Sequence, residues 1–392
     1  MLAAALRCPG TVLLDGPRPD ADTGRQGARL FADPIRALTA RTAAEVGPLL
    51  SALDRALAEG HHVAGLLSYE AGAALSGGPV ADTVAGGPVP LGWFGVYDAP
   101  VDVPPDVVDA ALAAAGPATV AAPTFALSPE AYRARVAAIR AHIRAGDVYQ
   151  VNLTAPVRFS TDADPVALFA ALRRRQRVAY GAFVRLDRAA VASVSPELFF
   201  RVDAGRTITA RPMKGTVGRG PSPAADDALA DALRASPKDR AENLMIVDLL
   251  RNDLSRVTEP GSVRVPALFE AERYETVTQM TSTVAGDLRP NVGLGDVLRA
   301  LFPCGSITGA PKLRAMGIIR DLEVGPRGVY CGAIGAASPD GTAAFNVAIR
   351  TAVVADGEGR YDVGSGIVWD SDAGAEYAEC LLKARVLTDL AP

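Results

Sequence analysis

Hydrophobic and polar positions follow a helical period in some stretches of this chain. Apolar residues spaced three and four apart predict helices over residues 43–60 and 129–145. Ser128 and Pro129 supply a helix start for the second of these, and Gly146 supplies its stop. Further helices are expected from Ser236-Pro237 to about residue 250, from near residue 312, and over about 372–390.

Other stretches are short apolar runs that predict strands. These runs cover residues 148–153, 179–186, 190–194, 198–202, 207–210, 276–284, 328–337, 343–354 and 361–368. They follow one another rather than alternating with helices, which predicts a large antiparallel α+β domain. Residues 101–123 are rich in alanine and proline with little periodicity, which predicts a linker or surface excursion between residues 1–123 and 124–392.

Composition narrows the possible functions. The 392 residues carry a net charge of −4, so the basic excess typical of nucleic-acid binders is missing. The chain contains no run of 18 apolar residues, so no membrane-spanning helix is predicted. The apolar stretch at its start is too short for a signal peptide. The four cysteines form no CxxC pair, and there are only three histidines, so zinc sites and histidine triads are disfavoured. A reduced, cytoplasmic location is expected.

Lysine is unusually rare. Of the 40 basic residues only Lys214, Lys238, Lys312 and Lys383 are lysines. An amine can lose its proton and attack a substrate, whereas a guanidinium cannot, so each lysine is a candidate for chemistry. The alternative is a chance bias of composition.

Two pairs of acids share a helical spacing. Asp239 and Glu242 lie three residues apart on one predicted helix, and Glu376 and Glu379 lie three apart on the last one. Residues at this spacing share a helix face, so two such helices could hold Mg²⁺ between them. The alternative is two solvated faces, with Glu379 and Lys383 forming an ordinary ion pair.

Several single residues are candidates for a chemical role, and each also has an ordinary structural interpretation. Lys214 follows a strand in a tight turn, where it could be a nucleophile or a structural ion-pair partner. Glu197 lies between two strands and could donate a proton if it is buried, or simply be an exposed turn residue. Arg350 stands in an apolar run, where a buried guanidinium needs an anion such as a substrate carboxylate. The glycine clusters around residues 215, 305–309, 332–335 and 364–366 fit no phosphate-loop or dinucleotide pattern.

Taken in order, the segments that carry these residues resemble the chorismate-utilising enzymes. The segments are GDVYQVNLT (146–154), SVSPELFF (193–200), RPMKGT (211–216), AENLMIVDLLRNDLSRV (241–257), LFPCGSITGAPKLRAM (301–316), RGVYCGAIG (327–335), FNVAIRT (345–351) and GSGIVWDSDAGAEYAECLLKA (364–384). The resemblance implies two large packed antiparallel β-sheets with helices outside, in a single compact unit, with residues 1–123 completing the sheets and 124–392 forming the catalytic domain.

The resemblance also implies how the site is built. Mg²⁺ would be held by Glu242 and Glu379, with Asp239 and Glu376 nearby, and would bind the ring carboxylate of chorismate. Glu197 matches the general acid for the departing C4 hydroxyl. The remaining substrate contacts implied are the backbone at Gly215, Thr216, Gly364, Ser365 and Gly366, together with Tyr330, Arg350, Lys383 and Gln150.

Three positions favour the branch of the family that aminates chorismate at C4 for 4-aminobenzoate and folate biosynthesis. Lys214 stands where anthranilate synthases usually have alanine, and in the C4-aminating branch it resembles a covalent nucleophile. Gln150 replaces a lysine that activates water in isochorismate and salicylate synthases. Gln279 replaces a histidine linked to pyruvate loss, although several C4-aminating relatives also have that histidine. The alternatives are anthranilate synthesis and a non-catalytic chorismate-binding subunit.

The resemblance implies that ammonia comes from a separate glutamine amidotransferase subunit, since no cysteine stands in a G-x-C-x-G elbow.

Overall fold

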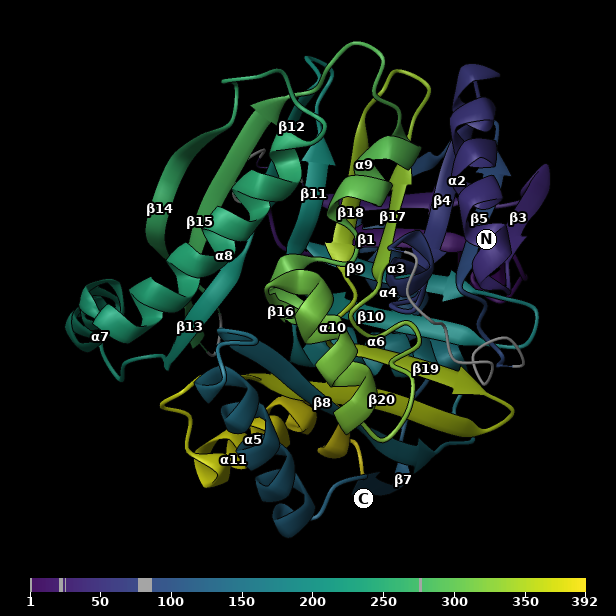
Figure 1. The fold of residues 1–392 in the computed structure, drawn as a ribbon. Helices are drawn as coiled ribbons and strands as arrows, with labels where there is room; N and C mark the ends of the chain where they lie inside the picture. Colours follow the sequence, from purple (N-terminus) through teal and green to yellow (C-terminus); the bar gives the residue numbers. More distant parts are fainter. Residues whose placement is uncertain (1, 21–23, 25, 77–86, 275–276) are drawn as a thin grey trace.

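The computed structural model describes residues 2–20, 24, 26–76, 87–274 and 277–392. Two ten-stranded antiparallel sheets form its framework, and helices lie around them (Figure 1). The predicted α+β fold of two large antiparallel sheets with outer helices is confirmed. Among the described helices, none is both long and apolar enough to cross a lipid bilayer.

The first sheet has the strand order β16-β8-β20-β19-β10-β9-β1-β2-β6, with β7 paired to β8. Its strands are β1 (Val12–Gly16), β2 (Gly27–Phe31), β6 (Val101–Val103), β7 (Ala121–Phe125), β8 (Gln150–Ser160), β9 (Tyr180–Arg185), β10 (Ala190–Ser195), β16 (Gly309–Ala310), β19 (Thr351–Ala355) and β20 (Glu358–Ile367). The long ladder between β8 and β20 sets Asn152 opposite Gly366.

The second sheet has the order β13-β15-β12-β11-β18-β17-β4-β5-β3, with β14 paired to β15. Its strands are β3 (Arg36–Ala40), β4 (His62–Leu67), β5 (Gly92–Tyr97), β11 (Leu198–Val202), β12 (Thr207–Arg211), β13 (Met213–Gly218), β14 (Arg264–Arg273), β15 (Val277–Asp287), β17 (Ala333–Ala337) and β18 (Ala343–Val347). The strand predicted from Thr276 is β15, and Thr276 itself lies outside the described residues.

The helices begin where the sequence supplies caps. Ser128, Ser236 and Asp372 each accept a hydrogen bond from the backbone N–H three residues further on, as N-caps do. The helices are α1 (Leu2–Ala5), α2 (Ala43–Ala58), α3 (Ala71–Leu75), α4 (Pro105–Ala113), α5 (Pro129–Arg144), α6 (Pro165–Arg175), α7 (Pro223–Ala235), α8 (Pro237–Ser255), α9 (Leu294–Leu301), α10 (Lys312–Leu322) and α11 (Ala373–Thr388), with a 3₁₀ turn η2 (Gly305–Ile307).

The first hundred residues supply strands to both sheets. β1 pairs with β9 in the first sheet, and β4 pairs with β17 in the second. The division of the chain at residue 123 stays a prediction.

The alanine- and proline-rich stretch over 101–123 differs from the expected linker. It contains β6, α4 and the start of β7. Val108 and Leu112 lie four residues apart on α4 and are both buried, so a short apolar stripe is enough to hold this helix against the protein.

The predicted strand over 343–354 is also wrong as a single element. It is two strands, because the chain leaves the second sheet after β18 and enters the first sheet at β19. Arg350 lies at this crossing with a positive φ of 52°, so it is a turn residue and not part of an apolar strand. Likewise, the strand predicted over 328–337 begins only at Ala333, since Gly328 and Cys331 have positive φ and bend the chain before it.

Candidate functional site

Most of the predicted site residues meet around one cavity of about 370 Å³. Strand β13 and helix α8 line one side of it, and β20 and α11 line another. The predicted residues on its wall are Glu197, Lys214, Gly215, Thr216, Asp239, Glu242, Tyr330, Arg350, Gly364, Gly366, Glu376, Glu379 and Lys383. These residues come from distant parts of the chain, and the two sheets bring them together.

Lys214 lies on β13, and its amine is within the cavity. Burial lowers the pKa of this amine, while the negative charges of Glu242 and Glu197 act in the opposite direction. A lowered pKa increases the fraction of neutral amine, which is the nucleophilic form. The structure therefore provides an amine suited to attack a bound molecule.

Two glycines create the space around Lys214. A β-carbon at Gly215, where φ is 81°, would lie 2.9 Å from Asp239 Oδ1. A β-carbon at Gly366 would lie 3.3 Å from Lys214 Nζ and would collide with the amide of Gln150. Both positions therefore require glycine, the first for its backbone conformation as well as its size.

Glu197 occupies the connection between β10 and β11 and is fully enclosed. Its backbone N–H donates to Ser195 Oγ, and its carbonyl accepts from Val347 N–H, so the backbone is fixed. Burial raises the pKa of its carboxyl to about 7, against the opposing effects of a hydrogen bond from Ser306 and the charge of Lys214. Near neutral pH, Glu197 can therefore hold a proton and donate it.

The four acids predicted from the helix spacing line the same cavity. Asp239 and Glu242 come from α8, and Glu376 comes with Glu379 from α11. Burial raises the pKa of Glu242 against the opposing charges of Lys214 and Lys238, and the charges of Asp239 and Glu376 also raise it. In their present positions, the described residues include no group of three or more His, Cys, Asp or Glu side chains that could hold a metal ion. Carboxylates from two helices that repel one another are nevertheless a donor set suited to a hard divalent cation.

Cationic groups also line the cavity. Arg350 donates from Nη1 to the carbonyl of Lys383 at 2.7 Å, which fixes the guanidinium against α11. Lys383 Nζ donates to the Gly364 carbonyl at 2.8 Å and forms an ion pair with Glu379 Oε1 at 2.5 Å. The ordinary ion pair between Glu379 and Lys383 thus exists, but both partners are on the cavity wall.

Two predicted residues are not on the wall. Ser365 points to the opposite face of β20, where its hydroxyl lies 3.0 Å from that of Tyr132, because alternate residues of a strand face opposite sides. The substrate contact predicted at this residue is through its backbone, and it stays a prediction. Gln150 lies behind Gly366, buried, and its amide N and O have no hydrogen-bond partner within the described part of the chain.

The cavity also contains residues that the sequence reasoning missed. Asn152, Ser306 and Asp362 all line it. Lys238, a candidate only through the rarity of lysine, lines it too, so three of the four lysines of the chain are on this wall. Ser306 belongs to the GSITG glycine cluster, whose shape gives no hint of its partner.

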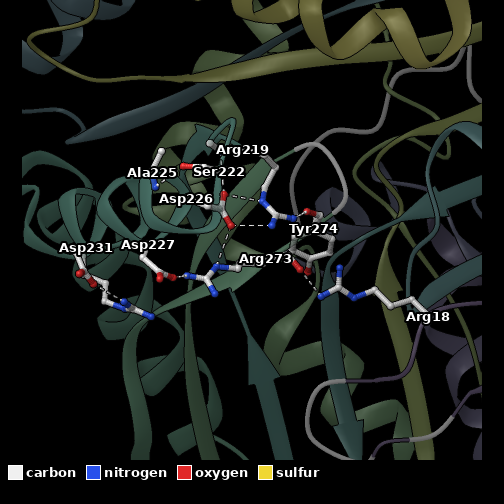
Figure 2. Close-up of polar contacts among 11 residues, drawn as sticks. Arg18, Arg219, Ser222, Ala225, Asp226, Asp227, Asp231, Arg273 and Tyr274 are labelled. Atoms are coloured by element: carbon white, nitrogen blue, oxygen red, sulfur yellow. Dashed lines mark hydrogen bonds and ion pairs between the residues drawn. The ribbon is translucent and has the colours of Figure 1, made fainter.

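A polar network supports the strand that carries Lys214. Figure 2 shows Arg219, just past the end of β13, and Arg273 of β14 both directed at Asp226 of α7. Arg219 contacts the Asp226 carboxylate at 2.7 and 2.8 Å, and this pairing lowers the pKa of Asp226 to about 2. The carboxylate thereby joins the end of β13, the neighbouring hairpin and α7.

Comparison with known proteins gives this cavity its context. Residues 18–389 match the family model of the chorismate binding enzymes. The chain is 46% identical over 265 residues to aminodeoxychorismate synthase component 1 of Klebsiella aerogenes, which covers 67% of this chain and 58% of that protein. It is 45% identical over 265 residues to anthranilate synthase component 1 of Streptomyces coelicolor, covering 67% and 52%. The chain thus spans a little over half the length of these two relatives.

Solved structures share the whole fold. Anthranilate synthase component I from Streptococcus pneumoniae superposes with a TM-score of 0.73 at 25% identity, covering 97% of this chain and 90% of the other. The menaquinone-specific isochorismate synthase of Escherichia coli gives 0.78 at 17% identity, covering 100% and 91%. Because the family model matches nearly the whole length and the fold agrees, the chain belongs to the family of chorismate binding enzymes.

Proposed function

We propose that this protein aminates chorismate at C4, using ammonia, and releases 4-amino-4-deoxychorismate. One observation carries the proposal: Lys214 lines the cavity, where burial lowers the pKa of its amine, and the proton donor Glu197 lines the same cavity. Relatives named aminodeoxychorismate synthase component 1 are 42–46% identical to the chain, which supports the same reaction.

The residues suit two successive allylic displacements. The neutral amine of Lys214 attacks C2, both ring double bonds shift along the diene, and the C4–O bond breaks while Glu197 gives its proton to form water. Ammonia then attacks C4, both double bonds shift back, and the C2–N bond breaks to release Lys214 as a neutral amine. The new C4 ammonium returns a proton to Glu197. Overall, chorismate and ammonia give the amine and water, and the enzyme is regenerated.

The remaining lining residues would hold the substrate. Chorismate carries two carboxylates, and Arg350 with Tyr330 would bind the enolpyruvyl one through charge and hydrogen bonds. Glu242 and Glu379, with Asp239 and Glu376 close by, would hold Mg²⁺, which supplies a positive charge for the ring carboxylate. Gly215, Thr216, Gly364 and Gly366 would form the walls beside the ring.

Anthranilate synthesis is the second candidate, because a relative with that name is 45% identical to the chain. Both reactions begin with chorismate and ammonia, but anthranilate requires amination at C2 and loss of pyruvate. A lysine that occupies C2 blocks addition of ammonia at that carbon, so Lys214 favours the C4 product. Gln279, which lines the cavity, offers no basic group to promote pyruvate loss.

Ammonia has to be supplied, and we infer a separate glutamine amidotransferase subunit as its source. The designation component 1 of several relatives supports a two-component enzyme. A cytoplasmic location is part of the proposal, supported by four cysteines that are all free thiols.

Product analysis tests the reaction directly. The purified chain is incubated with chorismate, Mg²⁺ and an ammonium salt, and products are separated by liquid chromatography with mass detection. We expect 4-amino-4-deoxychorismate as the main product. Fluorescent anthranilate as the main product would overturn the assignment in favour of the second candidate. Binding of chorismate without any turnover would favour a non-catalytic subunit.

A further inference from the structure

Ser306 contacts the proton donor of the site. It lies in the 3₁₀ turn η2 with only 4% of its surface exposed, and its hydroxyl donates to Glu197 Oε1 at 2.6 Å. The two residues are 109 positions apart in the chain, and both line the cavity.

The turn that carries Ser306 is held from several sides. The carbonyl of Ile307 accepts from Arg327 Nη1 at 2.8 Å and from Asn152 Nδ2 at 3.2 Å. The Thr308 hydroxyl donates back to the carbonyls of Cys304 and Gly305, each at 3.2 Å. Ser306 is therefore presented to Glu197 by a fixed backbone and not by a mobile loop end.

The proton of the Ser306 hydroxyl has a defined direction. Cys304 Sγ lies 3.2 Å from Ser306 Oγ, and burial raises the pKa of the Cys304 thiol to about 12. The thiol thus keeps its proton near neutral pH and can donate it to Ser306 Oγ. Ser306 has a single proton, which is then directed to Glu197.

A carboxyl group can carry its acidic proton on either oxygen. Oε1 of Glu197 already accepts the hydrogen bond from Ser306, so an acidic proton on that same oxygen would lie close to the Ser306 hydroxyl proton and repel it. The acidic proton is therefore favoured on Oε2. The Met213 backbone N–H also hydrogen-bonds the carboxyl and favours its charged form, as Ser306 does.

We propose that Ser306 is a positioning residue for the general acid: by donating to Oε1 of Glu197, it keeps the transferable proton on Oε2, ready for the departing C4 hydroxyl. This inference rests on the proposed function for the identity of the leaving group. The hydrogen bond between Ser306 and Glu197 does not depend on it.

Other titratable groups near Glu197 also affect the pKa of its carboxyl. Lys214 and Cys304 are the titratable groups that act on it from β13 and from the loop before η2. Beyond Lys214 lie Glu242, Glu379 and Lys383, which act on that lysine. A substitution at Ser306 leaves all of these in place.

The test compares Ser306→Ala with Thr258→Val, which removes a buried hydroxyl that donates to the Leu254 carbonyl and does not line the cavity. Amination kcat/KM is measured against pH, and thermal midpoints confirm folding. In Ser306→Ala, loss of a hydrogen bond to the carboxylate should move the alkaline pKa upward by about one to two units and lower the plateau rate about tenfold. Thr258→Val should keep the wild-type pKa, and Ser306→Thr should restore it.

An unmoved alkaline pKa in Ser306→Ala, or the same shift in both variants, would overturn the proposal. If Ser306→Ala does not fold, Ser306→Cys replaces it, because a thiol is a weaker donor and should give an upward shift as well. Infrared spectra of the protonated carboxyl against pH, with Glu197→Gln to assign the band, follow the same titration without turnover. If the wild type forms no aminodeoxychorismate, the proposed function fails, while the infrared titration still decides the role of Ser306.

Discussion

Gly215 and Asp239 approach so closely that a β-carbon on the glycine would lie 2.9 Å from the aspartate Oδ1. This close approach sets β13 against α8, and so sets the strand of the proposed nucleophile Lys214 beside the acids of the proposed metal site. The φ of 81° at Gly215 adds a backbone conformation that side chains disfavour.

Gly215→Ala should therefore cost stability and activity together. Strain and steric overlap should lower the free energy of unfolding by about 1–3 kcal/mol, measured by denaturant titration. Gly218→Ala on the same strand is the control, because a β-carbon there meets nothing within 4 Å. If the two variants have the same free energy of unfolding, the structure around Gly215 and Asp239 accommodates the added β-carbon without loss of stability.

Replacement of Lys214 tests the covalent route. Lys214→Ala should reduce amination by about 10³-fold or more, since only a nucleophile at this position opens the path through C2. Chorismate affinity, measured by calorimetry, should stay within a few-fold of the wild type, and Lys214→Arg should be as inactive as the alanine variant. Unchanged turnover in Lys214→Ala would rule out the nucleophile.

The sequence predicted those parts of the site that depend on local spacing. Ser236 and Asp372 start α8 and α11, and the i, i+3 pairs on these helices then place all four acids around the same cavity. Arg350 was identified as a candidate, but its place at a crossing between sheets depends on long-range pairing that no local pattern encodes.

Two further features depend on long-range pairing as well. The register of β20 against β8 decides that the Ser365 side chain faces away from the cavity. Ser306 gave no signal, because its partner Glu197 is separated from it by 109 residues.

The pH dependence of amination should reflect Glu197. Its carboxyl must be protonated to donate, so the rate should fall as the pH rises through its pKa of about 7. Glu197→Gln should lower the rate about 10²–10⁴-fold and remove this alkaline limb. If the fall in rate at alkaline pH persists in Glu197→Gln, a group other than Glu197 must cause it.

The same substitution should stabilise the protein at high pH. The folded-state pKa of Glu197 is raised from 4.5 to about 7, so ionisation favours the unfolded chain as the pH rises from 4.5 to 7. Above pH 7 this cost is complete and amounts to about 3 kcal/mol. The stability gain of Glu197→Gln over the wild type should grow between pH 5 and pH 8 in denaturant titrations. A gain independent of pH would contradict the buried, protonated state.

Glu379 allows the proposed metal site to be separated from the ion pair with Lys383. If Glu379 binds Mg²⁺, Glu379→Gln should weaken the Mg²⁺ dependence of chorismate binding by at least about tenfold, because a charged oxygen donor is lost. Lys383→Met breaks the same ion pair at 2.5 Å but keeps the carboxylate, so it should leave the Mg²⁺ requirement near that of the wild type. Titrations of Mg²⁺ at fixed chorismate, followed by calorimetry, compare the two variants. Equal effects of both substitutions would assign Glu379 to the ion pair alone, and the metal would then have to be held by Glu242 with other donors.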